Sequence, residues 1–163
     1  MVFAVAAMVA IAACSTGDNA ASSNPLQQLQ TTNECLGCNL QGTDLSGLDL
    51  TSAKLNQANL SGANLSSANL QGALLDQANL SGADLSGADL SQTALTSANL
   101  SNANLSQAKL VGSYLRDATL TGANLEATDL TDANLSAVKV DEAALATATL
   151  KNAILPDGTI QPE

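Results

Sequence analysis

A leucine stands at every fifth position from Leu40 to Leu155, and this five-residue period is the feature that most limits the fold. Val140 is the single exception in the run. An α-helix turns about 100° per residue, so leucines five apart would spiral around its surface without forming an apolar face. A straight β-strand alternates its side chains, so successive leucines would point to opposite sides. Neither regular element suits a run of this length.

The other positions of the unit indicate how the chain can keep its leucines on one side. A small residue, usually alanine, stands two places before most of the leucines. In a short extended segment these two residues point to the same side, and the residue between them points away. Glycine often stands two places after the leucine, where it permits backbone conformations that cost other residues energy. The pattern therefore predicts short extended segments joined by corners and closed into coils, with successive coils paired by backbone hydrogen bonds.

The unit A(D/N)LxG occurs here as ANLSG, ADLSG and ANLSS, and it resembles the repeat of the pentapeptide-repeat family. The resemblance covers about residues 38–157. It implies an all-β fold, namely a right-handed quadrilateral parallel β-helix with four units per coil, in which leucine and the small residue point inward. The twenty-four consecutive units of this chain would then form a solenoid of about six coils, each stacked on its neighbours.

The N-terminal region divides into two parts. Residues 1–14 form an apolar run that is shorter than the roughly 20 residues of a membrane-spanning helix and fits a secretory signal peptide. Its ending, IAAC, resembles a bacterial lipobox, which implies cleavage before Cys14 and a lipid anchor on that residue. Cleavage that leaves Cys14 unmodified is the alternative. No Lys or Arg precedes Lys54, although a signal peptide normally begins with one. Residues 15–24 are small and polar and predict a flexible tether.

Both ends of the repeat are expected to be atypical. Residues 25–37 predict a capping segment, because Asn24 is a good N-cap and Pro25 suits a first helical turn. We expect a short helix over about residues 25–32 that covers the open end of the first coil. After Leu155, the sequence PDG predicts a turn that ends the repeat, leaving residues 158–163 as a C-terminal tail.

Two cysteines, Cys35 and Cys38, stand just before the first leucine unit. In an exported protein they would form a disulfide that fixes the cap. Free buried thiols and a redox-active pair are the two alternatives, although no nearby base is evident that would lower a thiol pKa. We expect no metal site, because the chain has no His and only one further Cys.

If four units make one coil, residues twenty apart stack into outward columns. Asn39, Asn59, Asn79 and Asn99 form one column, whose amides can hydrogen-bond along the rod. Structural support is the predicted role, and a binding or ice-ordering face is the alternative. Two further columns give one side a mildly acidic character, for which we predict a solvated face, with a designed polyanion as the alternative. They are Asp49, Asn69, Asp89, Lys109, Asp129 and Thr149, and Asp44, Asn64, Asp84, Asn104, Asn124 and Ala144.

The fourth column places Leu74, Ala94 and Tyr114 outward on three successive coils, with Val111 at a corner of the adjacent face. Clustered exposed apolar residues often mark a contact site, so we predict a partner or self-association site here. Scattered exposure without a role is the alternative.

The composition limits the function further. A net charge of −10 argues against binding nucleic acid or anionic lipid through a basic patch. No nucleophile–base constellation and no cofactor motif is evident, so we predict neither catalytic residues nor a cofactor.

Two function classes remain. One is a structural or protein-interaction scaffold of the bacterial cell envelope, periplasmic or attached to the outer membrane by a lipid on Cys14. Family members with CxxC before the repeats also make the thylakoid lumen an alternative compartment. The other class comes from quinolone-resistance pentapeptide proteins, which bind DNA gyrase by imitating duplex DNA in shape and charge. This chain shares their acidity, but it departs from them in three ways: an export-like N-terminus, a core without Phe, and no evident C-terminal dimerising segment.

Overall fold

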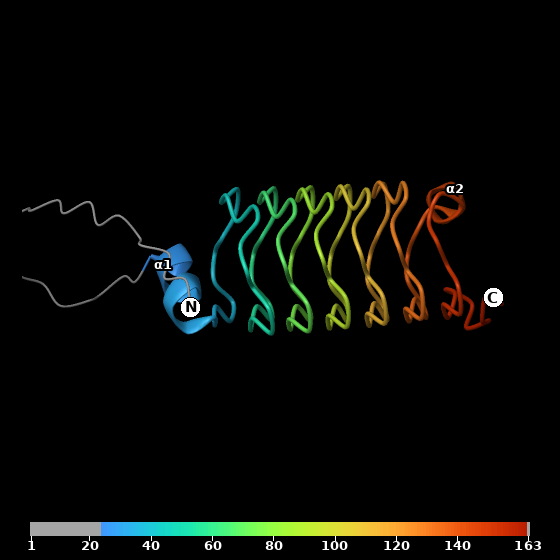
Figure 1. Ribbon diagram of the computed structural model, residues 1–163, viewed down its shortest axis with the longest axis horizontal. Helices are drawn as coiled ribbons and strands as arrows, with labels where there is room; N and C mark the ends of the chain where they lie inside the picture. Colours follow the sequence, from blue (N-terminus) through green and yellow to red (C-terminus); the bar gives the residue numbers. More distant parts are fainter. Residues whose placement is uncertain (1–23, 163) are drawn as a thin grey trace, which may run out of the picture.

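The computed structural model describes residues 24–162 and shows a short helix followed by a rod of stacked coils (Figure 1). The two helices are α1, Pro25–Thr32, at the N-terminal end of the rod, and α2, Glu142–Leu145, at the C-terminal end. The predicted signal peptide, the lipidation site at Cys14 and residues 15–23 of the tether lie outside the described residues. Neither helix within residues 24–162 has the length and hydrophobicity to cross a membrane.

Parallel bridges between residues twenty apart hold the coils together. Asn39 pairs with Asn59, Asn59 with Asn79, and the other faces repeat this spacing. Each unit contributes one bridging residue and not a long strand, because a corner follows every extended segment. Typical hydrogen bonds run from the Leu45 N–H to the Asn64 carbonyl, at 2.7 Å, and from the Asn64 N–H to the carbonyl of residue 43, at 2.9 Å. The spacing confirms that four units make one coil.

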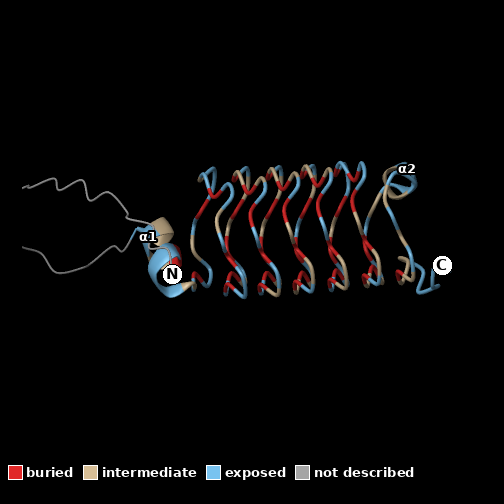
Figure 2. Cartoon of the chain, viewed as in Figure 1, coloured by how far each residue is buried: buried red, intermediate tan, exposed pale blue. Residues whose placement is uncertain are grey.

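The interior is a stack of leucine and small side chains, as the period predicts. Every repeat leucine from Leu40 to Leu135 is at most 2 % exposed, and buried segments line the inside of the rod (Figure 2). Thr93, Ser113 and Thr128 occupy the small inward position in place of alanine, and their hydroxyls donate to backbone carbonyls. Each buried side-chain nitrogen or oxygen in the described part of the chain has a hydrogen-bond partner.

The corners use left-handed backbone whichever residue stands there. Gly62 has a φ of 63°, and Gln77 and Ser97 have nearly the same value, 60° and 58°. Glycine is therefore favoured at this position but not required. An L-residue in this conformation costs on the order of 1 kcal/mol. The neighbouring coil offsets part of this cost, since the Gln77 N–H donates to the Thr96 carbonyl at 2.9 Å.

The N-terminal end begins with α1, over the residues for which the sequence predicts a helix. The Asn24 side chain accepts a hydrogen bond from the Leu26 N–H at 3.1 Å, and Pro25 occupies the first turn. Leu29 is 1 % exposed and belongs to the same core cluster as the repeat leucines. Cys35 and Cys38 form a disulfide with their Cα atoms 5.3 Å apart, so they are not free thiols.

The last coil departs from the repeat. The sequence predicts that the column starting at Asp44 ends at Ala144, but its last bridge joins Asn104 to Asn124. The segment containing Ala144 forms α2 instead. Its sequence, EAAL, combines strong helix formers that compete with an extended segment where no further coil pairs with it.

The chain then returns to the bridging pattern and reverses. Thr149 pairs with Asp129, and Ile154 pairs with Asn134, both in parallel. Ile160 then pairs with Ile154 in the antiparallel sense. The tail therefore follows the edge of the last coil on one face only.

Candidate interaction surface

One face of the rod carries an outward apolar strip, which consists of Leu74, Ala94 and Tyr114. Bridges join Leu74 to Ala94 and Ala94 to Tyr114, so the three residues lie on successive coils in one column, as the sequence predicts. Leu74 is 40 % exposed and Tyr114 is 57 % exposed, while Ala94 is half-buried between them. We call this column the apolar strip.

The position of each residue in the repeat explains why the strip points outward. Leu75 and Leu115 occupy the inward positions and are buried, which leaves Leu74 and Tyr114 in the outward middle position of their units. The inward neighbour of Tyr114 is Ser113, whose hydroxyl donates to the Leu110 carbonyl at 2.7 Å. The five-residue period therefore determines that these apolar side chains point outward.

Polar and charged residues border the apolar strip. Lys54, one coil before Leu74, forms a salt bridge of 2.6 Å with Glu34. At the other end, Tyr114 pairs with the polar Asn134 on the next coil. To one side of Tyr114, the guanidinium of Arg116 lies 3.4 Å from the Asp117 carboxylate at the corner of the same coil. The strip is thus a bounded patch of about three coils and not the start of a continuous apolar face.

Val111 lies where the sequence predicts, at the corner that leads into the Tyr114 unit, and it is half-buried. Its carbonyl accepts a hydrogen bond from the Gln92 N–H at 2.9 Å, which fixes the corner against the preceding coil. Val111 is therefore an apolar residue at a corner of the same coil as Tyr114, with less exposed surface than Tyr114.

The asparagine column has a different character, because its side chains bind one another. The amide of Asn59 donates to Asn39 at 3.1 Å, and Asn79 and Asn99 continue the series, each at 3.2 Å. The same oxygens accept from backbone N–H groups two residues on, as in the 3.2 Å bond from Ser61 to Asn59. The predicted ladder is confirmed, and its polar atoms are engaged within the rod.

The acidic columns also satisfy their carboxylates internally. Hydrogen bonds from the Ser46 hydroxyl and N–H lower the pKa of Asp44 below its usual value, and the Asn64 amide adds a third at 3.1 Å. The Ser86 N–H and hydroxyl lower the pKa of Asp84 in the same way. The carboxylates therefore stay ionised near neutral pH and serve the turns of the coil.

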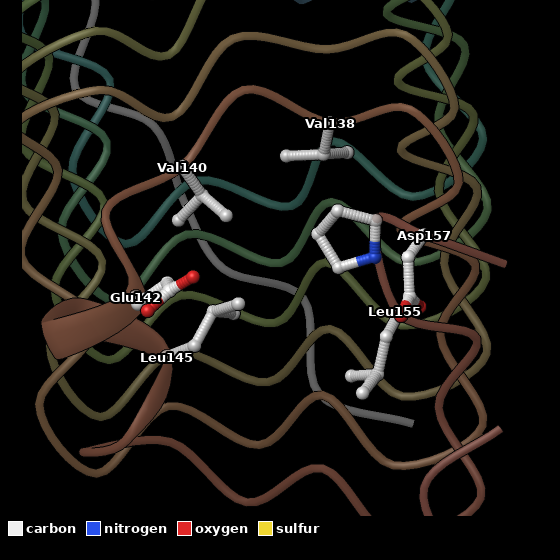
Figure 3. Close-up of a pocket in the computed structure, with 7 residues that line it drawn as sticks. Val138, Val140, Glu142, Leu145, Leu155 and Asp157 are labelled. Carbon is white, nitrogen blue, oxygen red and sulfur yellow. The ribbon is translucent and has the colours of Figure 1, made fainter. Parts of the chain in front are cut away.

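The C-terminal end contains a hollow that the sequence does not reveal. Val138, Val140, Leu145 and Leu155 point into it from opposite sides of the last coil (Figure 3). Pro156 completes the apolar wall, and Glu142 and Asp157 stand at its rim. Among residues 24–162, no three His, Cys, Asp or Glu side chains gather in a way that could hold a metal ion.

The family model for Pentapeptide repeats matches the chain over residues 36–66, 63–102 and 98–136, which together exceed half of its length. The chain is a member of the pentapeptide-repeat family. Pentapeptide-repeat proteins are generally structural or interaction proteins and not enzymes.

Several solved pentapeptide-repeat proteins are similar to this one. Rfr23 from the cyanobacterium Cyanothece 51142 is 32 % identical over 79 % of this chain and 99 % of its own, with a TM-score of 0.41. A thylakoid-lumen protein of Arabidopsis thaliana is 32 % identical over 69 % of this chain and 75 % of its own, with a TM-score of 0.34. Full-length QnrB1, a plasmid-mediated fluoroquinolone resistance protein, is 21 % identical over 79 % of both chains, with a TM-score of 0.37. No curated protein matches this pentapeptide-repeat protein.

Proposed function

We propose that this pentapeptide-repeat protein is a non-enzymatic interaction scaffold of the bacterial cell envelope. Its right-handed β-helix of about six coils would present the apolar strip, with Val111 at its border, to a protein partner. The observation that carries the proposal is the exposure of Leu74 and Tyr114 in one column, at 40 % and 57 %.

The apolar strip differs from the other faces because its side chains are not engaged in hydrogen bonds within the rod. The amides of the asparagine ladder and the carboxylates of Asp44 and Asp84 are engaged in hydrogen bonds within the rod. By contrast, the Tyr114 hydroxyl has no hydrogen-bond partner among the described residues, and its ring is exposed. Tyrosine is enriched at protein interfaces because it combines a large apolar ring with a polar tip. The strip is therefore the face best suited to bind a protein.

Two features support a location in the envelope. The Cys35–Cys38 disulfide suits an oxidising compartment, since stable disulfides are rare in most cytosolic proteins. The apolar run at residues 1–14 and its lipobox-like ending favour export and a lipid anchor on Cys14. We propose a periplasmic or outer-membrane-associated lipoprotein, with the thylakoid lumen as the alternative compartment.

Gyrase binding by imitation of DNA is the less favoured function. A DNA mimic needs a continuous negative surface, whereas Lys109 stands between Asp89 and Asp129 in one column. In the neighbouring column, asparagine separates Asp44 from Asp84. Together with the disulfide, these interruptions favour the envelope scaffold.

The compartment can be tested by the intact mass of the native protein purified without reductant. We expect a chain that begins at Cys14, carries added lipid and is lighter by two hydrogens because of the disulfide. A chain that keeps Met1 and has free thiols would contradict the envelope proposal and favour the gyrase-binding alternative.

The strip can be tested by site-specific photo-crosslinking in intact cells. A photoreactive benzoyl-phenylalanine in place of Tyr114 should capture one defined protein, and Leu74→Asp in the same chain should abolish the adduct. Asn124, exposed on the column across the rod, is the matched control position and should give no adduct. Equal labelling from both positions, or none from Tyr114, would contradict a partner-binding role for the strip.

A further inference from the structure

The apolar strip has one large side chain on each side of a small one. Leu74 lies one coil before Ala94, and Tyr114 lies one coil after it. Because stacked strands are about 4.8 Å apart, Leu74 and Tyr114 lie about 10 Å apart along the rod. Ala94 is half-buried between them. A patch with large groups on both sides of a small centre can oppose a copy of itself turned end for end.

The corner column beside the strip carries one charge of each sign. Asp76 stands two residues after Leu74, and Arg116 stands two residues after Tyr114. Thr96 lies between them, and its N–H donates to the Asp76 carboxylate at 3.0 Å. These three corners belong to the three coils of the strip. This side of the strip is therefore negative at one end and positive at the other.

Both charged groups can bind a further group of opposite charge. The Asp76 carboxylate accepts the Asn56 amide at 3.1 Å and the Thr96 N–H at 3.0 Å, which hold it in place. A carboxylate has about four acceptor sites, so capacity for a guanidinium remains. The Nε atom of Arg116 lies 3.4 Å from the Asp117 carboxylate, and its terminal amino groups have no partner among residues 24–162. Arginine and carboxylate form strong charge-assisted hydrogen bonds when they meet.

A two-fold axis that crosses the rod at Ala94 would bring complementary groups together. It exchanges the coil before Ala94 with the coil after it and keeps each residue on its own side of the strip. Leu74 then opposes Tyr114 of the second copy, and Asp76 opposes Arg116. Because a two-fold contact is reciprocal, one dimer contains each of these pairs twice.

Rods that lie side by side in the same direction lack this complementarity. A two-fold axis along the rod would exchange the two sides of the strip. The corner column on the other side contains Gln71 and Val111 on the coils of Leu74 and Tyr114. Asp76 would then oppose Gln71, and Arg116 would oppose Val111. Neither charge gains a partner of opposite sign, so the antiparallel arrangement is favoured.

The net charge of the protein also favours contact through this column. At −10, two copies repel each other. From Glu34 to Ile154, the column of the strip has only two charged residues, Glu34 and Lys54, which bind each other at 2.6 Å. The columns that start at Asp44 and Asp49 are acidic. Two rods therefore meet with less repulsion through the strip than through the acidic columns.

We infer that the apolar strip binds a second copy of this protein, with the two rods side by side and antiparallel. The Tyr114 ring of each copy lies against Leu74 and Ala94 of the other, and Arg116 binds Asp76. The inference rests on the proposed function, because it names the partner of the strip. The dimer is closed, since both copies use the same face. A contact of about three coils is smaller than a typical stable interface, so the association is reversible and depends on concentration.

Sedimentation velocity of the native protein, from low micromolar to several hundred micromolar, tests this inference. We expect an equilibrium between monomer and dimer. Arg116→Glu should weaken the dimer about tenfold or more, because it places a carboxylate opposite Asp76. This side chain is exposed, so the variant should keep the melting temperature of the wild type. Lys109→Glu, exposed on an acidic column, is the matched control, because it changes the net charge equally and should leave the dimer unchanged.

A charge exchange between two variants tests the antiparallel pairing itself. Asp76→Arg should also weaken self-association, because the introduced arginine faces Arg116. An equimolar mixture of the Asp76→Arg and Arg116→Glu variants should associate about as well as the wild type, because each arginine then faces a carboxylate of the other variant. If Asp76→Arg does not fold, Asp76→Asn keeps an acceptor for the Thr96 N–H and should weaken the dimer severalfold.

The C-terminal end of the rod provides a second control. This end is open, since no further coil follows Leu145 and Leu155 within residues 24–162 and both leucines are only half-buried. Ala143→Glu adds a charge at an exposed position of α2, at the open end. Because α2 lies away from the strip, this variant should leave the antiparallel dimer unchanged.

Three results would overturn the inference. The first is a wild-type protein that stays monomeric over the whole concentration range. The second is a dimer that Ala143→Glu disrupts and Arg116→Glu does not, which would place self-association at the open end. The third is a mixture of the two folded charge variants that does not associate.

The crosslinking test at Tyr114 separates this inference from the proposed function. An adduct with the mass of two copies of this chain would support both. An adduct with a different protein would contradict the dimer and leave the interaction scaffold in place. The absence of any adduct would contradict both.

Discussion

Leu135 and Leu155 occupy equivalent positions of the repeat on adjacent coils, yet they differ in burial. Leu135, in the regular coils, is fully buried, whereas Leu155, in the last coil, is half-buried. The five-residue period decides the direction in which a side chain points. A coil on each side decides whether that side chain is removed from water. Each unit of a solenoid is therefore stabilised chiefly by its neighbours, and the terminal unit lacks one of them.

The strongest test of this comparison is to truncate one leucine in each region. We expect Leu85→Ala, at the centre of the rod, to lower the free energy of unfolding by about 3–4 kcal/mol, because it leaves a cavity in a closed core. We expect Leu155→Ala, at the open end, to cost about 1 kcal/mol, since part of its side chain already contacts water. Urea denaturation followed by circular dichroism measures both values.

Leu135→Ala provides the control for position along the rod, because Leu135 is as buried as Leu85 but lies next to the last coil. It should resemble Leu85→Ala. If Leu155→Ala lowered the free energy of unfolding as much as Leu85→Ala, the side chain of Leu155 would be as fully removed from water as that of Leu85. That result would contradict the difference in burial between the regular coils and the last coil.

The regular coils could be predicted from the sequence because their determinants are local and repeated. The small residue and the leucine two places on define the inward side, and the outward positions of Leu74 and Tyr114 follow from the period alone. The last coil could not be predicted in this way. Helix α2 forms where helix propensity outweighs strand pairing, and the pairing of Ile160 with Ile154 depends on an edge that exists only because the repeat ends. A partner for the apolar strip could not be predicted from the sequence either, because nothing in the repeat unit specifies one.

The N-terminal end of the rod carries a disulfide, and the contribution of this bond to stability can be measured by removing it. We expect Cys35→Ala with Cys38→Ala to lower the free energy of unfolding by about 2 kcal/mol, since the bond closes only a short loop. Amide hydrogen exchange should increase in α1 and the first coil and stay unchanged near Ile154. Reduction of the wild-type protein should reproduce the effect without any substitution. Equal loss of protection at both ends would mean that the disulfide stabilises the rod as a whole.

The asparagine ladder allows a smaller comparison between coils. Asn79 bonds to Asn59 and Asn99 and also accepts the Ser81 N–H, whereas Asn134, among residues 24–162, accepts only from Ser136. We expect Asn79→Ala to cost about 2 kcal/mol and Asn134→Ala about 1 kcal/mol, the difference being the bonds between coils. Thermal or urea unfolding of the two variants measures it. Equal losses would show that the side-chain bonds between coils add nothing to the turn that each asparagine stabilises.

Acid should lower the free energy of unfolding slightly. Protonation of carboxylates in the regular coils should contribute more to this loss than protonation in the tail. Hydrogen bonds from the Ser86 N–H and hydroxyl hold the pKa of Asp84 below its usual 3.8. A carboxyl whose pKa is lower in the folded state stabilises that state above its unfolded pKa, and the contribution is lost as the pH falls through the folded value. The Thr159 hydroxyl and N–H lower the pKa of Asp157 in the same direction, but this turn lies beyond the last coil.

We therefore expect Asp84→Asn to reduce the drop in the urea midpoint between about pH 6 and about pH 3, because asparagine keeps the acceptor and has no charge to lose. Asp157→Asn should leave that drop unchanged and alter only the acid dependence of amide exchange in the tail. If the two variants shifted the midpoint alike, the tail would be part of the cooperative unit, and the division between regular coils and open end would fail.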